Sequence, residues 1–172
     1  MSNIGKKNIK IPENVSIIFE NSKVSIEGKL GKLEYPLSGE VLFSKENDTI
    51  KSFSKNKTMW GTEHKLLDNA IIGVSKGFKK TLNLVGIGYR VQVNKQTLTM
   101  KLGFSHDVIF TIPEGIKAVC PKPDQIVLFG TKKDFLHKVA SSIKLLRQPD
   151  AYKGKGIIFD NENLRLKEGK KK

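Results

Sequence analysis

Hydrophobic and polar residues alternate in short runs over residues 15–53, as in Val24-Ser25-Ile26-Glu27. Alternation with a period of two is typical of strands that bury one face. The runs are interrupted by Gly28, Gly31 and Gly39 and by the Glu46-Asn47-Asp48 cluster. Residues 15–53 therefore predict several short strands joined by turns.

The pattern changes from Thr58 to Lys80, where hydrophobic residues recur at the spacing of one helical face. These residues are Trp60, Leu67, Ile71, Val74 and Phe78. The second half repeats this order. Strand-like segments cover 82–93, 97–102, 106–112 and 125–129, with Pro113-Glu114-Gly115 and Pro121-Lys122-Pro123 as breakers. A helix is expected from Lys132 to Leu146, with Phe135, Val139, Ile143 and Leu146 on one face.

Two passages of strands followed by a helix predict an α+β fold. We expect two tandem similar domains, each a small, mainly antiparallel sheet packed against one helix, in preference to one large sheet spanning both halves. The predicted helices should bury Trp60, Leu67, Ile71 and Val74 in the first domain, and Phe135, Val139 and Ile143 in the second. The expected boundaries are 1–81, 82–148 and a basic tail at 149–172.

The predicted tail differs in composition from both domains. Pro149 closes the second helix, and the segment 150–156 is polar and rich in glycine. Residues 144–172 contain nine basic and four acidic side chains, which indicates an extended arm rather than part of a core. Truncation after Gln148 is therefore expected to leave both domains folded.

Charge narrows the class of partner. The 172 residues include 31 Lys and Arg against 17 Asp and Glu, a net charge of +14, which indicates a polyanionic partner. A hydrophobic share of 38% is enough for a core, and no apolar run is long enough to span a membrane. The first residues resemble neither a secretory signal nor a transit peptide. A single cysteine, Cys120, excludes an internal disulfide and any multi-cysteine metal site.

Several sequence patterns match enzyme motifs, but none lies in the secondary structure or has the full set of residues that the chemistry needs. Gly73-Val74-Ser75-Lys76-Gly77 fits the G-x-S-x-G nucleophile elbow, but Ser75 lies inside a helical period instead of a strand-to-helix turn. Gly86-Ile87-Gly88 lacks the third glycine of a dinucleotide fingerprint and predicts a bent or bulged strand. The three histidines, His64, His106 and His137, lie far apart, so we expect them on the surface or facing RNA. No catalytic residue, metal site or cofactor is predicted.

The segment from Pro149 to Ile157 carries the most specific pattern for polyanion binding. Lys153 and Lys155 alternate with Gly154 and Gly156 after the aromatic Tyr152. The lysines can neutralise phosphates, and the glycines allow the backbone N–H groups to approach an anion closely. The tyrosine can stack on a base or sugar, or pack on the second domain. A flexible tether is the alternative interpretation of this segment.

Several motifs in order give the chain a resemblance to bacterial-type large-subunit ribosomal protein six, nearly end to end. The start resembles the family opening: Ile4-Gly5-Lys6-Lys7, then Ile11-Pro12. The first helix resembles the family at Trp60-Gly61-Thr62, Gly73-Val74 and Gly77-Phe78. Two central motifs are Leu84-Val85-Gly86-Ile87-Gly88-Tyr89-Arg90 and Leu102-Gly103-Phe104-Ser105-His106. Residues 149–157 match the family signature, and Arg165 with Lys167-Glu168-Gly169-Lys170 matches the tail.

The resemblance implies two copies of one α+β fold and a structural role in the large ribosomal subunit, without catalysis. It implies direct binding to large-subunit (23S-type) rRNA near the stalk base and the sarcin–ricin loop, neighbouring ribosomal proteins as partners, and a position near docked translation factors. No membrane is implied. The candidate rRNA-binding residues are Lys6, Lys7, Arg90, His106, Arg147, Tyr152, Lys153, Gly154, Lys155, Gly156, Arg165, Lys167 and Lys170.

The chain departs from the family at several positions, where guanidinium and other groups are replaced. These positions are Asn3, Asn8, His64, His137, Ile158, Phe159 and Leu166. Either the RNA site is altered there, or other proteins cover the apolar surface of the tail. A general single-strand binder, a hydrolase and a factor that binds ribosomes transiently are the alternative functions. Because the family opening starts at Met1, we expect a ribosome in a bacterium or in an organelle with its own genome. The 28 Lys against three Arg favour an organelle, with a mitochondrion ahead of a plastid.

Overall fold

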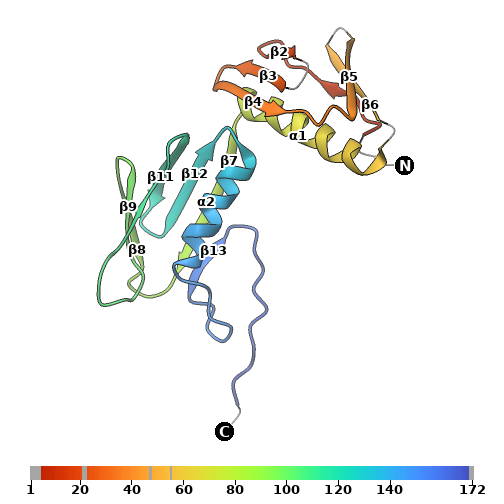
Figure 1. Cartoon of the computed structure of the whole chain (residues 1–172). Helices are drawn as coiled ribbons and strands as arrows, with labels where there is room; N and C mark the ends of the chain where they lie inside the picture. Colours follow the sequence, from red (N-terminus) through yellow and green to blue (C-terminus); the bar gives the residue numbers. More distant parts are fainter. Residues whose placement is uncertain (1–4, 21–22, 47, 55, 171–172) are drawn as a thin grey trace. The chain divides into compact units, whose positions relative to one another are not determined.

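The computed structural model describes residues 5–20, 23–46, 48–54 and 56–170, with only the backbone of Lys57. The chain divides into two compact units (Figure 1). One comprises Met1–Phe78 with Thr131–Lys133, and the other comprises Lys79–Gly130 with Asp134–Lys172. Asn3, one of the departures from the family, lies outside the described residues, as do the last two lysines of the chain.

The first unit contains two three-stranded antiparallel sheets and one helix. One sheet has the order β2-β3-β4, from Ser16–Phe19, Lys23–Gly28 and Gly31–Pro36. The other has the order β1-β6-β5, from Ile9–Lys10, Thr49–Ser54 and Val41–Glu46. The helix α1, Lys57–Ser75, packs against strands of both sheets. Its N-terminus is capped by Asn56, whose side chain accepts the Thr58 N–H.

The prediction of which residues α1 buries is largely correct, but the predicted C-terminal end of the helix is wrong. Leu67, Ile71 and Val74 are buried in the core, whereas Trp60 is only half-buried. The helix stops at Ser75, because Gly77 adopts a left-handed conformation with φ of +74° and turns the chain. Phe78 and the two following lysines therefore begin strand β7, Phe78–Val85, instead of extending the helix.

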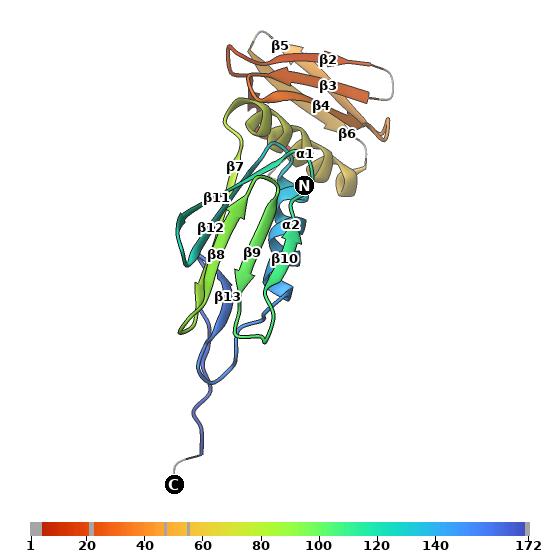
Figure 2. The same ribbon diagram turned by 90° about the vertical axis from the view of Figure 1, so that its left-hand side faces the viewer.

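The second unit repeats this construction with one added strand. A meander of β8, β9 and β10 (Arg90–Asn94, Thr97–Lys101 and Val108–Thr111) forms one sheet, seen face-on in Figure 2. The other sheet has the order β11-β12-β7-β13, in which β11 is Ile116–Lys122, β12 is Gln125–Gly130 and β13 is Gly156–Phe159. The helix α2 is Lys133–Leu145. The predicted α+β class, with small antiparallel sheets and one helix in each half, is confirmed.

The two helices present the same spacing of buried residues. In α1 these are Leu67, Ala70, Ile71 and Val74, and in α2 they are Leu136, Val139, Ala140 and Ile143. The sheets correspond as well, because β1-β6-β5 has the connectivity of β7-β12-β11. Phe135, predicted to be buried, remains 37% exposed. The apolar face is instead centred on the next residue, Leu136, which keeps the i, i+3, i+4, i+7 spacing.

The predicted strands of the second unit are wrong in two places. The segment 82–93 is two strands, because a turn at Gly86–Tyr89 separates β7 from β8 and places Gly88 at φ +79°. The sequence predicted no strand between residues 112 and 125 and treated Pro121 as a breaker, yet β11 contains Pro121 and pairs with β12. It lies at the sheet edge, and its register shifts between Val119 and Lys122. An edge position with a register shift tolerates a proline that cannot donate a hydrogen bond.

The last strand corrects the expected separation of the tail from the core. Strand β13 pairs antiparallel with β7, and Ile157 lies opposite Leu84. Ile157 is fully buried, and its N–H donates to the carbonyl of Arg147 at 2.9 Å. Residues 156–159 therefore belong to the sheet of the second unit, and the expectation that residues after Pro149 lie outside the core is wrong for this segment.

Candidate nucleic-acid interface

The signature segment after α2 folds into a closed loop around Asp150. The Asp150 carboxylate accepts the N–H of Lys153 at 2.9 Å, and its carbonyl accepts the N–H of Gly154 at 3.0 Å. The Asp150 N–H donates to the carbonyl of Lys155 at 3.0 Å, which closes the loop. Backbone N–H groups, that of Lys153 first and then those of Tyr152 and Ala151, lower the pKa of the Asp150 carboxyl below its ordinary value. We call residues 150–155 the Asp150 loop.

The loop uses its own backbone donors internally. An anion-binding concavity of backbone N–H groups was expected here, but the N–H groups of Lys153 and Gly154 already donate to Asp150. For these two N–H groups the expectation does not hold, because the Asp150 carboxylate accepts that of Lys153 and the Asp150 main-chain carbonyl accepts that of Gly154. Tyr152, Lys153 and Lys155 are exposed, so their side chains are the groups of this loop that can reach an external ligand.

The two glycines of the signature have structural roles. Gly154 has φ of +68°, in the left-handed region that glycine adopts without strain. A Cβ on Gly156 would lie 2.6 Å from the Cα of Pro149 and 2.7 Å from the carbonyl oxygen of Gln148. Both glycines are buried. They shape the connection between α2 and β13, and little of their surface is exposed.

The C-terminal residues run back along the Asp150 loop. The N–H of Lys167 donates to the carbonyl of Ala151 at 2.8 Å. A Cβ on Gly154 would lie 3.4 Å from a methyl group of Leu166, so this residue rests against the loop. Arg165 and Lys167 flank Leu166 and are exposed. Two basic side chains of the tail are thus held next to the two lysines of the loop, and Lys170 lies beyond them, also exposed.

A groove adjoins the Asp150 loop, at the end of α2 and beside the segments that carry Tyr89 and Phe104. We call it the Phe104 groove, and it is lined by Tyr89, Phe104, Leu145, Leu146, Arg147, Gln148, Asp150 and Lys155. The guanidinium carbon of Arg147 lies 4.9 Å from the centre of the Phe104 ring. His106 stacks on the same ring, with centres 5.9 Å apart and planes inclined by 17°. The groove thus joins Phe104, Arg147 and Lys155, which are far apart in the sequence, and His106 adjoins it through the Phe104 ring.

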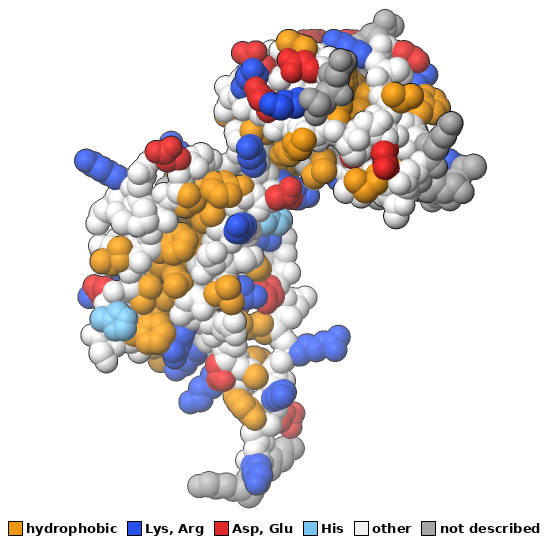
Figure 3. Space-filling model, in the orientation of Figure 1, with side chains coloured by type: hydrophobic (Ala, Val, Ile, Leu, Met, Phe, Trp, Pro, Cys, Tyr) orange, Lys and Arg blue, Asp and Glu red, His pale blue; other side chains and the backbone are white. Residues whose placement is uncertain are grey.

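The two aromatic residues that line the groove, Tyr89 and Phe104, were not among the predicted site residues, although they belong to the two central motifs that resemble the family. A Cβ on Gly86 would lie 3.0 Å from the Tyr89 ring, and one on Gly103 would lie 3.2 Å from it. The glycines of the two central motifs therefore make room for this ring. Arg90 follows Tyr89 directly, at the start of β8, and is exposed. Hydrophobic side chains gather in a band on this unit in Figure 3, with Lys and Arg side chains toward its C-terminal end.

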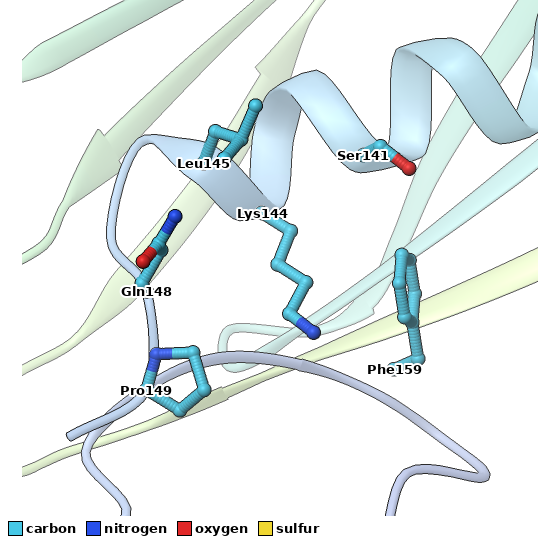
Figure 4. A pocket seen from close by; sticks show the side chains of 6 residues that line it. All are labelled: Ser141, Lys144, Leu145, Gln148, Pro149 and Phe159. Carbon is cyan, nitrogen blue, oxygen red and sulfur yellow. The ribbon is translucent and has the colours of Figure 1, made fainter. Parts of the chain in front are cut away.

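A second pocket separates the end of α2 from β13 and accounts for one departure from the family. Phe159 is half-buried beneath two lysines, with Lys80 Nζ 4.5 Å and Lys144 Nζ 5.0 Å from its ring centre. Figure 4 shows Lys144 reaching from the helix into this pocket toward Phe159. Lys144 also bonds Glu162 Oε2 at 2.7 Å and lowers the pKa of that carboxyl. Residues of the same unit therefore cover much of the Phe159 ring.

The other predicted residues lie in the first unit. Lys6 and Lys7 are exposed ahead of β1, and Lys7 lines a hollow with Lys10, His64 and Lys65 among others. They do not belong to the group around the Asp150 loop, which is formed by the second unit.

His64 does not lie on the surface, contrary to the sequence prediction. It is 4% exposed, and its Nδ1 lies 2.9 Å from Ser52 Oγ. The Ser52 hydroxyl donates to the carbonyl of Gly5 at 3.2 Å and accepts the Trp60 indole N–H at 2.9 Å. Burial lowers the pKa of His64. The histidine is thus part of a buried polar network that holds the N-terminal segment, whereas His106 and His137 are exposed.

The features that first suggested enzymatic chemistry have structural explanations. Ser75 is the last residue of α1, and its hydroxyl donates to the carbonyl of Ile72 at 3.2 Å. Across the part of the chain that the structure describes, no three His, Cys, Asp or Glu side chains gather as metal ligands. Neither described helix is long and apolar enough to cross a membrane.

Comparison with known proteins identifies the family. Residues 85–160, from the end of β7 to just beyond β13, match the sequence model of ribosomal protein L6. The large ribosomal subunit protein uL6m of Reclinomonas americana is 45% identical over the whole length of both chains. The uL6 proteins of Rhodospirillum rubrum and Phenylobacterium zucineum are 41% and 38% identical, again over the full length of each chain. With its motifs, its repeated α+β fold and this similarity along its whole length, the chain belongs to the ribosomal protein L6 (uL6) family.

Proposed function

We propose that this protein is a structural constituent of the large ribosomal subunit and binds large-subunit rRNA chiefly through its second unit. Membership of a family of structural, non-enzymatic ribosomal proteins supports the first part. One observation carries the second part. The Asp150 loop carries Lys153 and Lys155, and a hydrogen bond joins it to the tail segment that carries Arg165 and Lys167. Arg147 lines the adjoining groove, and His106 stacks on the Phe104 ring of that groove.

The proposed binding is largely electrostatic. Each Lys or Arg that neutralises an RNA phosphate releases condensed counterions, which favours association. The four loop and tail cations come from two chain segments that the hydrogen bond between Lys167 and Ala151 holds together. Arg147 can add a bidentate contact, and exposed Tyr152 can stack on a base.

The internal hydrogen bonds of the Asp150 loop serve this function by preorganisation. A loop that is already closed around Asp150 loses less conformational freedom when its lysines meet RNA. The carboxylate that satisfies the backbone donors is thus a positioning group, and the contacts with RNA come from the side chains of Lys153 and Lys155.

The place of the protein within the large subunit and the assignment of rRNA binding to particular segments are also part of this proposal. We place the protein near the stalk base and the sarcin–ricin loop, beside neighbouring ribosomal proteins and close to docked translation factors. We assign rRNA binding mainly to residues 149–172, with residues 1–81 and 82–148 as the two domains that support it. Lys6, Lys7 and Arg90 would add further contacts. The relatives come from bacteria and a mitochondrion, which supports a bacterial or organellar ribosome.

Co-sedimentation tests the proposal against the transient-factor alternative. The full chain should remain with isolated large subunits through high-salt washing, because a structural constituent is held by many contacts at once. A control chain with Lys153→Ala and Lys155→Ala should fold equally well by circular dichroism but be released at lower salt. Complete loss of the unaltered protein in the first high-salt wash would favour a transient factor.

A further inference from the structure

We propose that the Phe104 groove receives an unpaired nucleobase, which stacks on the ring of Phe104. This inference rests on the proposed RNA binding and adds a subsite that reads single-stranded RNA. It differs from the phosphate contacts assigned to the lysines, because it depends on a planar apolar surface instead of charge.

The first argument is the exposure of the Phe104 ring. The ring is 41% exposed although Arg147 and His106 both lie against it. Leu145, which also lines the groove, is 64% exposed. An exposed ring with an imidazole and a guanidinium in contact with it offers, with them, a planar surface on which a base can stack. Every base has such a face, so this surface needs no particular sequence.

The second argument is that the stacking surface is held in place before any ligand binds. Leu102, two residues before Phe104, is fully buried, and Gly103 packs its backbone against Tyr89. On the other wall, the carbonyl of Arg147 accepts the N–H of Ile157 in β13. The two walls are therefore fixed by the meander and by β13, so binding a base costs little ordering of the protein.

The third argument concerns the charges at the groove. Arg147 and Lys155 supply cations for the phosphates on either side of an inserted nucleotide. The single acidic side chain among the lining residues, Asp150, is engaged by backbone N–H groups of its own loop. In a duplex the base faces are covered by their neighbours, so only an unstacked nucleotide can use the Phe104 ring.

Substitution of Phe104 by Leu tests the inference in the full chain. Leucine keeps an apolar side chain but removes the planar ring. The probes are a short single-stranded oligoadenylate and an RNA duplex of the same length. We expect F104L to weaken oligoadenylate binding by roughly five- to a hundredfold and to leave duplex binding unchanged. The salt dependence of oligoadenylate binding should not change, because no phosphate contact is lost.

Two further variants serve as controls. Phe53 is another exposed phenylalanine, 63% exposed on β6 of the first unit, so F53L should alter neither probe. F104W retains a planar ring and should bind oligoadenylate at least as well as the unaltered chain, whereas a purely packing role would make it deleterious. An F104L protein that binds both probes like F53L, or loses both equally, would overturn the inference. If the unaltered chain binds neither probe nor rRNA, the proposed function fails as well.

Discussion

At the scale of single residues, His64 links the core of the first unit to its N-terminal segment. Its imidazole lies on α1 and meets Ser52 of β6, which in turn holds the carbonyl of Gly5. A Cβ on Gly5 would lie 2.5 Å from the Trp60 ring, so this segment passes close to the indole. The network fills the interior with paired polar groups, each of which would be costly if left without its partner.

The buried imidazole should make stability depend on pH. Because burial lowers the pKa of His64 in the folded state, the unfolded chain takes up this proton first as the pH falls below the ordinary histidine value of 6.5. The nearby Asp68 carboxylate opposes the shift, and Lys65 adds to it. The contribution of His64 to stability is therefore present above that pH and is lost progressively below it.

Replacement of His64 by Asn tests this pH dependence, because Asn keeps a hydrogen-bonding group near Ser52 but does not titrate. Urea unfolding should be measured between about pH 7.5 and about pH 5.5 for both proteins. The variant should be less stable at the higher pH but should lose less stability on acidification. Equal losses in the two proteins would show that His64 does not carry this dependence.

At the scale of elements, β13 ties the signature segment to the fold. It covers the outer edge of β7 and buries Ile157 completely. Its four residues are too few to show a period, and they follow a glycine-rich stretch, so the sequence alone indicated an arm. The helices were predictable because their apolar residues repeat over several turns. The one-residue error at Phe135 arises because Phe135 and Leu136 are both apolar, and only packing selects between them.

Two truncations separate the roles of β13 and of the residues beyond it. Removal of everything after Gln148 deletes β13, so it should destabilise the second unit by at least the cost of removing one buried isoleucine side chain, about 2–5 kcal/mol. Removal after Glu162 keeps β13 and the contact between Lys144 and Glu162. That shorter truncation should therefore unfold at nearly the same urea concentration as the full chain. Equal stability of both truncated chains would contradict the assignment of β13 to the core.

The candidate site was also only partly predictable from the sequence. The exposed lysines and the tyrosine of residues 152–155 were evident from their alternation with glycine. The internal use of the backbone donors was not, because the carboxylate that accepts them, Asp150, could equally have faced solvent. The Phe104 groove joins residues about 40 positions apart in sequence. Local patterns cannot reveal such a contact.

At the scale of the whole molecule, the two units of a duplicated fold differ in the segments added to them. Both units have a meander, a second sheet and one helix with equally spaced core residues. The second unit has, in addition, β13, the Asp150 loop and the returning tail, and these bring Lys153, Arg165 and Lys167 together. A net charge of +14 gives the whole chain an attraction for polyanions. We propose that the cations of the second unit direct that attraction to the Asp150 loop and the tail.

The salt dependence of rRNA binding tests this central claim most directly. Binding of a large-subunit rRNA transcript should be measured across a salt series for the full chain and for the chain truncated after Glu162, which keeps β13. The truncation removes Arg165, Lys167 and Lys170–Lys172. If about three of these five contact phosphates, the slope of log affinity against log salt should fall by about two to three. An equally folded truncated chain with unchanged affinity and slope would contradict the account, because the tail cations would then make no contact with phosphates.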